Sequence, residues 1–233
     1  MAVLGIALAL FVPLAVIGGI AALVYYLVRG GPQERAHVTM RMLLRAYLRF
    51  AYLVSLVVFL VGAVSVLTPA FATAFGKGFS YTPQVYPCPA VSPVPGKTPG
   101  EFSPIPCNEP KDTREEDDLI RGVSLLVAGL VLGGGHRLGL AALEAAEERR
   151  NSGLARAEAL LATVGFGLTA IIAIPWAVYL VLHYALLGTA SSGGGTTEPP
   201  GGALAVALAF TPAWAYYLAV FVRRVRAGAP APA

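Results

Sequence analysis

The sequence predicts an all-α membrane protein, a polytopic bundle of five transmembrane helices, and two observations support this class. First, five long apolar runs contain almost no ionisable residue: Val3–Val28, Phe50–Phe75, Leu119–Leu138, Leu160–Leu187 and Ala203–Val222. Each run is close to the ~20 residues that a helix needs to cross ~30 Å of hydrocarbon. Second, the 233-residue chain is 56% hydrophobic and only 13% charged, whereas soluble domains carry about 25% charged residues.

The first run is expected to be a retained transmembrane helix within residues 1–30. No positively charged segment precedes it, and it is much longer than the apolar core of a secretory signal, which has about 7–15 residues. It ends in Arg29-Gly30-Gly31-Pro32 instead of a small-residue cleavage site.

The basic residues predict how the runs are oriented. Arginines cluster in residues 29–49, 137–156 and 223–226, whereas residues 188–202 contain no basic residue and residues 76–118 are more acidic than basic. Cytoplasmic segments are enriched in Lys and Arg, so we expect the N-terminus outside and the C-terminus in the cytoplasm. The same clusters account for the net charge of +4, and no nucleic-acid binding is expected.

Helices two to four are expected within residues 31–187, which include a Pro-rich outside loop at residues 76–118. Cys88 and Cys107 both lie in this loop, where an oxidising exterior favours a disulfide over two free thiols. Closing a loop of this size would stabilise it by roughly 3 kcal/mol. Residues 188–233 then form an outside linker, the fifth helix and a cytoplasmic tail.

Helix three is expected to continue into a cytoplasmic helical hairpin at about residues 139–160. The segment Leu140–Arg150 consists of strong helix formers. Asn151-Ser152-Gly153 then ends this helix, because Gly suits a left-handed cap, and helix four follows at once.

Helix two is expected to begin before its apolar run, because residues 34–49 contain no Gly or Pro. Four basic residues recur there every fourth position and therefore share one helix face: His37, Arg41, Arg45 and Arg49. This basic stripe either rests on anionic lipid headgroups or pairs with the acidic residues of the hairpin: Glu144, Glu147 and Glu148.

The starts of helices two and four are alike, which indicates either a parallel two-helix repeat or chance likeness between Ala-rich helices. Helix two begins with Arg45-Ala46-Tyr47-Leu48 and runs into Tyr52-Leu53-Val54-Ser55-Leu56, and helix three ends in His136-Arg137. Over residues 38–187 this pattern resembles the DUF5671 family of uncharacterised bacterial membrane proteins. The resemblance implies a helical membrane fold and no activity. The chain departs from the family in its cysteine-bearing loop and in Glu158, which stands near the place of a second tyrosine.

No catalytic residues and no metal site are expected. A haem would need two imidazoles at matched depth, and His37 with His136 is the pair to consider; interfacial histidines are the alternative. The middles of the apolar runs hold no Asp, Glu, Lys or Arg, which argues against a stand-alone proton pump or antiporter.

Pro175 and Pro212 lie near the middles of their runs, where each would kink its helix. Interrupted helices at matching places can mark a binding site. A pocket for a lipid, quinone or pigment would then be lined by four aromatic residues: Trp176, Trp214, Tyr216 and Tyr217. The alternative is ordinary packing of kinked helices.

Glycines on helix three predict close helix packing. Gly129 with Gly133, and Gly135 with Gly139, have the small-xxx-small spacing that lets two backbones approach. The partner is either another helix of this chain or a second subunit.

Together these features predict a multi-pass protein of the bacterial inner membrane that is not an enzyme and has no resident cofactor. The favoured function is an accessory or scaffolding subunit of a larger membrane complex, with membrane lipids and other subunits, or further copies of itself, as partners. The alternatives are a protein or transporter component that binds a lipophilic ligand, and a haem or quinone redox subunit.

Overall fold

The computed structural model describes residues 40–82, 113–144, 153–187 and 198–227, and all the secondary-structure elements in this part of the chain are helices. Its helices are α2 (Met40–Phe75), α3 (Lys77–Ser80), α4 (Arg114–Leu143), α6 (Gly153–Leu187) and α7 (Pro200–Ala227). Within these residues, α2, α4, α6 and α7 are long and apolar enough to cross a membrane. The predicted all-α class is therefore confirmed for this part, and these four helices fit four of the predicted spans. The first expected span, in residues 1–30, lies outside it.

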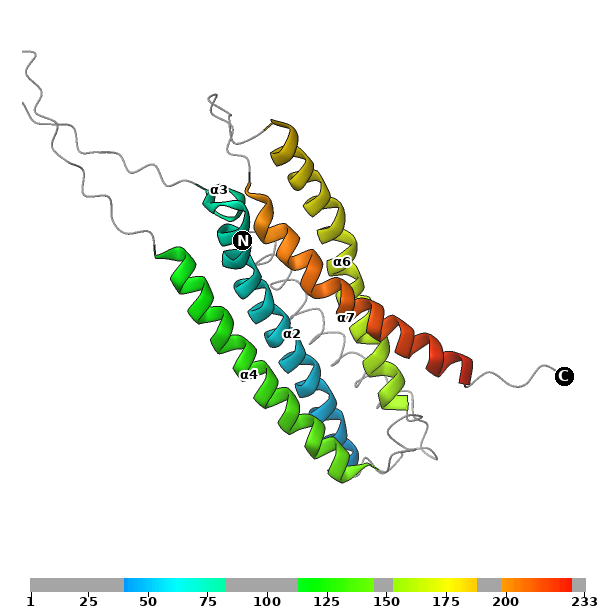
Figure 1. The fold of residues 1–233 in the computed structure, drawn as a ribbon. Coiled ribbons are helices and arrows are strands. Elements are labelled where there is room, and N and C mark those ends of the chain that lie inside the picture. The colour runs from blue at the N-terminus through cyan, green and yellow to red at the C-terminus, as the bar shows by residue number, and fades with distance from the viewer. Residues whose placement is uncertain (1–39, 83–112, 145–152, 188–197, 228–233) are drawn as a thin grey trace, which may run out of the picture.

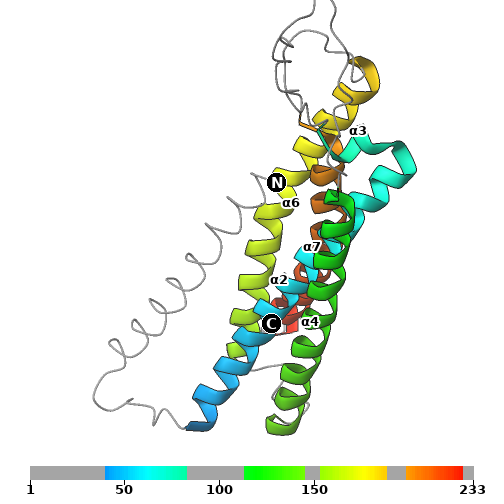
Figure 2. The same ribbon diagram turned by 90° about the vertical axis from the view of Figure 1, so that its left-hand side faces the viewer.

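The four long helices form two antiparallel hairpins (Figures 1 and 2). Helix α2 packs along α4, and α6 packs along α7. The hairpins meet mainly where α2 contacts α7, whereas α4 packs substantially against α2 alone. Helix α2 has 36 residues and at 1.5 Å per residue is about 54 Å long, so it extends well beyond ~30 Å of hydrocarbon.

Glycines hold α2 and α4 at close range. A Cβ on Gly62 would lie 2.6 Å from the backbone nitrogen of Leu126, and a Cβ on Gly129 would lie 2.6 Å from the backbone nitrogen of Phe59. Such distances are shorter than a side chain tolerates. Small residues therefore decide how closely these two helices approach, as in other membrane helix pairs.

The α6–α7 hairpin is held together by small side chains of a different kind. One face of α6 consists of buried alanines, which are three, four or eight residues apart: Ala155, Ala159, Ala162, Ala170, Ala173 and Ala177. These intervals place the alanines on one side of the helix. Pro175 and Pro212 both lie inside their helices, and α2 contains a third such residue, Pro69.

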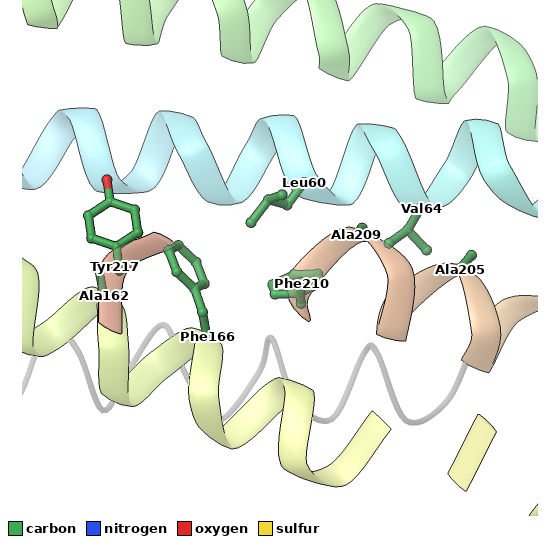
Figure 3. Close-up of a cluster of buried hydrophobic side chains, with 8 residues drawn as sticks. All are labelled: Leu60, Val64, Ala162, Phe166, Ala205, Ala209, Phe210 and Tyr217. Carbon is green, nitrogen blue, oxygen red and sulfur yellow. The ribbon is translucent and has the colours of Figure 1, made fainter. Parts of the chain in front are cut away.

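The hydrophobic core lies where α2, α6 and α7 meet (Figure 3). Its largest members are Leu60 from α2, Phe166 from α6, and Phe210 and Tyr217 from α7. The Phe166 ring lies 6.0 Å from the Phe210 ring and 5.6 Å from the Tyr217 ring. This core ties the two hairpins into one bundle.

The short helix α3 joins the hairpins at one end of the bundle, which we call the α3 end. Gly76, with φ of 93°, makes the turn into it, a conformation that favours glycine. The Phe79 ring packs 5.2 Å from the Tyr184 ring of α6. Ser80 approaches Gly201 of α7 so closely that a Cβ there would lie 2.9 Å from the Ser80 Cα.

One predicted boundary was wrong. Helix α4 ends at Leu143, and Glu144 has extended backbone angles of −121° and 130°, so the helix does not continue unbroken to Arg150. The physical reason is tertiary: Glu144 leaves the helix axis to reach a buried arginine of α2, described below. Residues 145–152, including Glu147 and Glu148, lie outside the described part.

Candidate functional site

A buried ion network lies at the end of the bundle opposite α3, which we call the arginine end. Arg49 of α2 contacts Glu144 at 2.6 Å, at the end of α4, and Glu158 of α6 at 2.5 Å. The side chains of Arg49 and Glu144 are 6% and 1% exposed, and that of Glu158 is 14% exposed. One guanidinium thus bridges both hairpins through charge-assisted hydrogen bonds.

The other two arginines of the basic stripe bind the end of α4. The Nη2 atoms of Arg41 and Arg45 donate to the backbone carbonyl of Leu143 at 2.8 and 3.0 Å. The last carbonyls of a helix lack internal partners and carry partial negative charge. The cations therefore satisfy the C-terminus of α4 and offset the nearby Glu144 carboxylate.

Helix α7 adds a fourth member at the same end. Arg224 donates from Nη1 to the backbone carbonyl of Ala155, near the start of α6, and its charge acts on Glu158. All four long helices therefore contribute to one network, which consists of Arg49 from α2, Glu144 at the end of α4, Glu158 from α6 and Arg224 from α7. With two arginines and two carboxylates, these four groups are neutral together.

Next to this network lies a chain of hydroxyl groups and rings. Arg137 of α4 donates to the Tyr52 hydroxyl at 3.3 Å, and its Cζ lies 5.8 Å from the centre of the Tyr52 ring. Tyr217 of α7 lies within electrostatic range of Tyr52, and its hydroxyl points toward α2 in Figure 3. His136 lies with Nδ1 3.4 Å from Ser55 Oγ.

A separate polar cluster fastens the α3 end. The Tyr81 hydroxyl donates to Asp118 at 3.2 Å, and Arg114 donates to the Thr82 carbonyl at 3.1 Å. Burial raises the pKa of Tyr81 above its ordinary value, and the charge of Asp118 raises this pKa further. Tyr81 therefore stays protonated and continues to donate. Among the described residues, no group of three His, Cys, Asp or Glu is placed to hold a metal ion.

The predicted glycines of helix three divide between two faces. A Cβ added to Gly129 would clash with Phe59. A Cβ added to Gly133 would lie 3.5 Å from Ser55 Cβ, and one added to Gly139 would lie 3.4 Å from Leu48. These three glycines face α2. Gly135 has no atom within 4 Å of that position, so it does not pack within the described part.

The four aromatic residues predicted to line a pocket are not brought together in the hollow that contains Trp176. This hollow, about 440 Å³, is lined by Ile171, Ile172, Pro175 and Trp176, all on α6. Trp214 instead packs against Gly167, since a Cβ on that glycine would lie 2.8 Å from Trp214 Nε1. Tyr217 is buried in the core and Tyr216 is 59% exposed.

The side of α4 that faces away from α2 carries a regular stripe. It consists of residues separated by four, three, four, three and four positions: Ile120, Ser124, Val127, Val131, Gly134 and Leu138. All six are exposed in the described part of the chain. We call these residues the outward stripe. Their average spacing of 3.6 residues is the period of the α-helix, so the six residues lie along one face of α4.

Several predicted features lie outside the described residues. These are the Cys88–Cys107 disulfide and His37, which was the partner of His136 in the haem hypothesis. Of the remaining histidines, His136 lies toward the arginine end of α4 and His183 toward the α3 end of α6. These two histidines therefore lie near opposite ends of the bundle.

Sequence reasoning missed two members of the ion network, Glu158 and Arg224. Glu158 was noted only as a departure from a family pattern. The sequence nevertheless indicates that Glu158 has a partner, because an acidic residue at the start of an otherwise apolar membrane helix needs one. In the sequence, Arg224 indicated only which side of the membrane the C-terminal tail lies on. The packing of α7 on α6 brings it to Ala155.

Comparisons with known proteins found no matching family model, no similar curated protein and no similar solved structure. The resemblance to the DUF5671 family therefore stays a prediction.

Proposed function

We propose that this chain is a non-enzymatic, multi-pass subunit of a larger assembly in the bacterial inner membrane, and that it docks through α4. The outward stripe of α4 carries this proposal. Ser124 and Gly134 are small residues in this stripe, and small residues are typical of helix–helix contacts inside membranes. A surface that only met lipid tails would gain nothing from such small residues, whereas a neighbouring helix could approach closely at them.

Two further properties of α4 support the proposal. Among the four long helices of the described part, α4 is both the least apolar and the least buried. It also packs substantially against α2 alone. A helix that is poorly apolar and has one neighbour gains most from a second protein partner.

The ion network fits a structural role better than a transport role. Arg49 is bonded to both carboxylates, and Arg41 and Arg45 are bonded to the end of α4. These contacts lock the hairpins together and provide a rigid body that can present α4. In the proposed orientation, the arginine end faces the cytoplasm and the α3 end faces outside.

Photo-crosslinking in the native membrane tests the proposal. A benzophenone amino acid at Val127 or Val131 should form one dominant adduct with a different protein of fixed mass, because these side chains lie on the outward stripe. The same amino acid at Ile171, exposed on α6, is the matched control and should give only a diffuse background.

Each other result has a definite meaning. An adduct of twice the chain mass would show that the chain associates with itself and not with a different subunit. An adduct that maps to residues 1–39 would show that the chain covers its own stripe. Either result, or equal labelling at Val127 and Ile171, would overturn docking to another subunit.

A further inference from the structure

Arg137 is the observation from which this inference starts. It donates a hydrogen bond to the Tyr52 hydroxyl and its guanidinium lies over the Tyr52 ring. Both partners are neutral. Arg49, by contrast, holds two carboxylates. In the part of the chain that the structure describes, no carboxylate lies within ion-pair distance of Arg137.

The guanidinium of Arg137 has capacity for a further ligand. It has five N–H donors, and Tyr52 receives one of them. Tyr216 and Tyr217 of α7 also lie within electrostatic range of Arg137, and Tyr216 is 59% exposed. The cation is therefore accessible and has phenols from two other helices near it.

The depth of Arg137 places it where lipid headgroups lie. It stands next to Leu138, the last residue of the third apolar run, and its partner Tyr52 lies two positions after Phe50, the first residue of the second run. Tyrosines concentrate at such boundaries because their rings are apolar and their hydroxyls are wet. An arginine at this level meets phosphate groups and not water alone.

Apolar surface continues from Arg137 toward the middle of the helices. Leu138 is 74% exposed, and Val131 and Leu130 are exposed as well. A ligand with an anionic head and apolar tails would match both parts of this surface. A soluble phosphate would use only the charge.

We propose that Arg137, with Tyr52, binds the phosphate group of an anionic phospholipid at the arginine end, with the acyl chains along α4. Charge complementarity carries this assignment, because the guanidinium is accessible and its partners are neutral. Two N–H groups of one guanidinium bind two phosphate oxygens well. Arg137 itself lies outside the outward stripe, whereas Val131 and Leu138, which the acyl chains would contact, belong to it.

Native mass spectrometry of the full chain, released from nanodiscs, tests the site. The nanodiscs contain phosphatidylcholine and phosphatidylglycerol in equal amounts. The protein should retain phosphatidylglycerol, and Arg137→Gln should reduce its occupancy about tenfold, the loss expected for one charge-assisted contact. Arg156→Gln is the matched control, because it removes an exposed arginine at the same end and should leave occupancy unchanged.

Further variants keep the test decisive. Tyr52→Phe removes the hydroxyl acceptor without changing charge and should reduce retention by a smaller factor than Arg137→Gln. Equal unfolding temperatures for the parent and the variants in phosphatidylcholine alone would show that all are folded. If Arg137→Gln fails to fold, the Tyr52→Phe result decides.

Three outcomes would overturn the site. One is equal retention of both lipids by the parent protein. Another is an equal fall in Arg137→Gln and Arg156→Gln, which would indicate diffuse attraction to the whole arginine end. The last is displacement of phosphatidylglycerol by millimolar inorganic phosphate, which would assign the contacts to a soluble anion.

Discussion

Arg49 shows how much one side chain decides in this bundle. It is 5% exposed and contacts carboxylates from both hairpins. Removing a charge from water is costly, and this cost is recovered only when hydrogen bonds and opposite charges surround it. The network therefore specifies how the hairpins meet, because a shift of either hairpin would leave a buried charge without its partner.

Replacing Arg49 should destabilise the protein strongly. Arg49→Met removes the buried cation that both Glu144 and Glu158 contact, and breaking a buried ion pair in this way costs about 3–5 kcal/mol. The triple variant Arg49→Met, Glu144→Gln and Glu158→Gln should recover much of this loss, because it removes the two buried negative charges together with the cation. Reversible unfolding in mixed micelles would measure both changes.

Arg41→Met is the control for Arg49→Met. Arg41 is exposed and shares its acceptor, the Leu143 carbonyl, with Arg45, so its loss should cost less than about 1.5 kcal/mol. If the triple variant were no more stable than Arg49→Met, the network would not behave as a coupled unit.

At the scale of single elements, α4 has two different faces. One face carries Gly122, Gly129 and Gly133 and lies against α2, and the opposite face is the outward stripe. Glycine spacing predicted that this helix packs closely. Of the four glycines it named, Gly129, Gly133 and Gly139 face α2 and Gly135 does not, because the small-xxx-small spacing does not fix the direction in which each glycine points.

Two alanine substitutions in α4 should have opposite effects. Gly129→Ala puts a Cβ 2.6 Å from the Phe59 backbone nitrogen, so α2 and α4 must separate, at a cost of about 1–3 kcal/mol. Gly134→Ala meets no atom within 4 Å and should be neutral or stabilise by up to about 1 kcal/mol through helix propensity. Thermal unfolding of the two variants side by side would check this, and equal effects would refute the packing explanation.

At the scale of the whole molecule, charge is divided between the two ends. The arginine end contains Arg41, Arg45, Arg137 and Arg224, whereas the start of α4 at the α3 end contains Glu115, Glu116 and Asp117. Since the four long helices all run between these ends, the enrichment of cytoplasmic segments in Lys and Arg predicts that the arginine end faces the cytoplasm.

Reporter fusions should reveal that orientation. Alkaline phosphatase, which is active only outside the cytoplasm, should be active after Gly96 and inactive after Ala233, because positive segments stay inside. A fusion before Met1 should be active, since five spans place the two termini on opposite sides. Activity at both termini or at neither would mean an even number of spans, and activity after Ala233 alone would mean the reverse orientation.

The sequence by itself determined the membrane class, the helical fold and the approximate extents of α2, α6 and α7. It could do so because hydrocarbon requires long apolar helices with satisfied backbones, a demand that is local and readable from composition. It also placed Arg41, Arg45 and Arg49 on one face, since helical spacing fixes which residues share a side.

Only the tertiary structure decided what these side chains meet. Arg49 and Glu158 are separated by 109 positions, and no local rule relates them until the two hairpins dock. The early end of α4, the glycines that face α2 and the dispersal of the aromatic residues have the same origin. Each depends on how helices rotate and cross, which is set by packing among all of them at once.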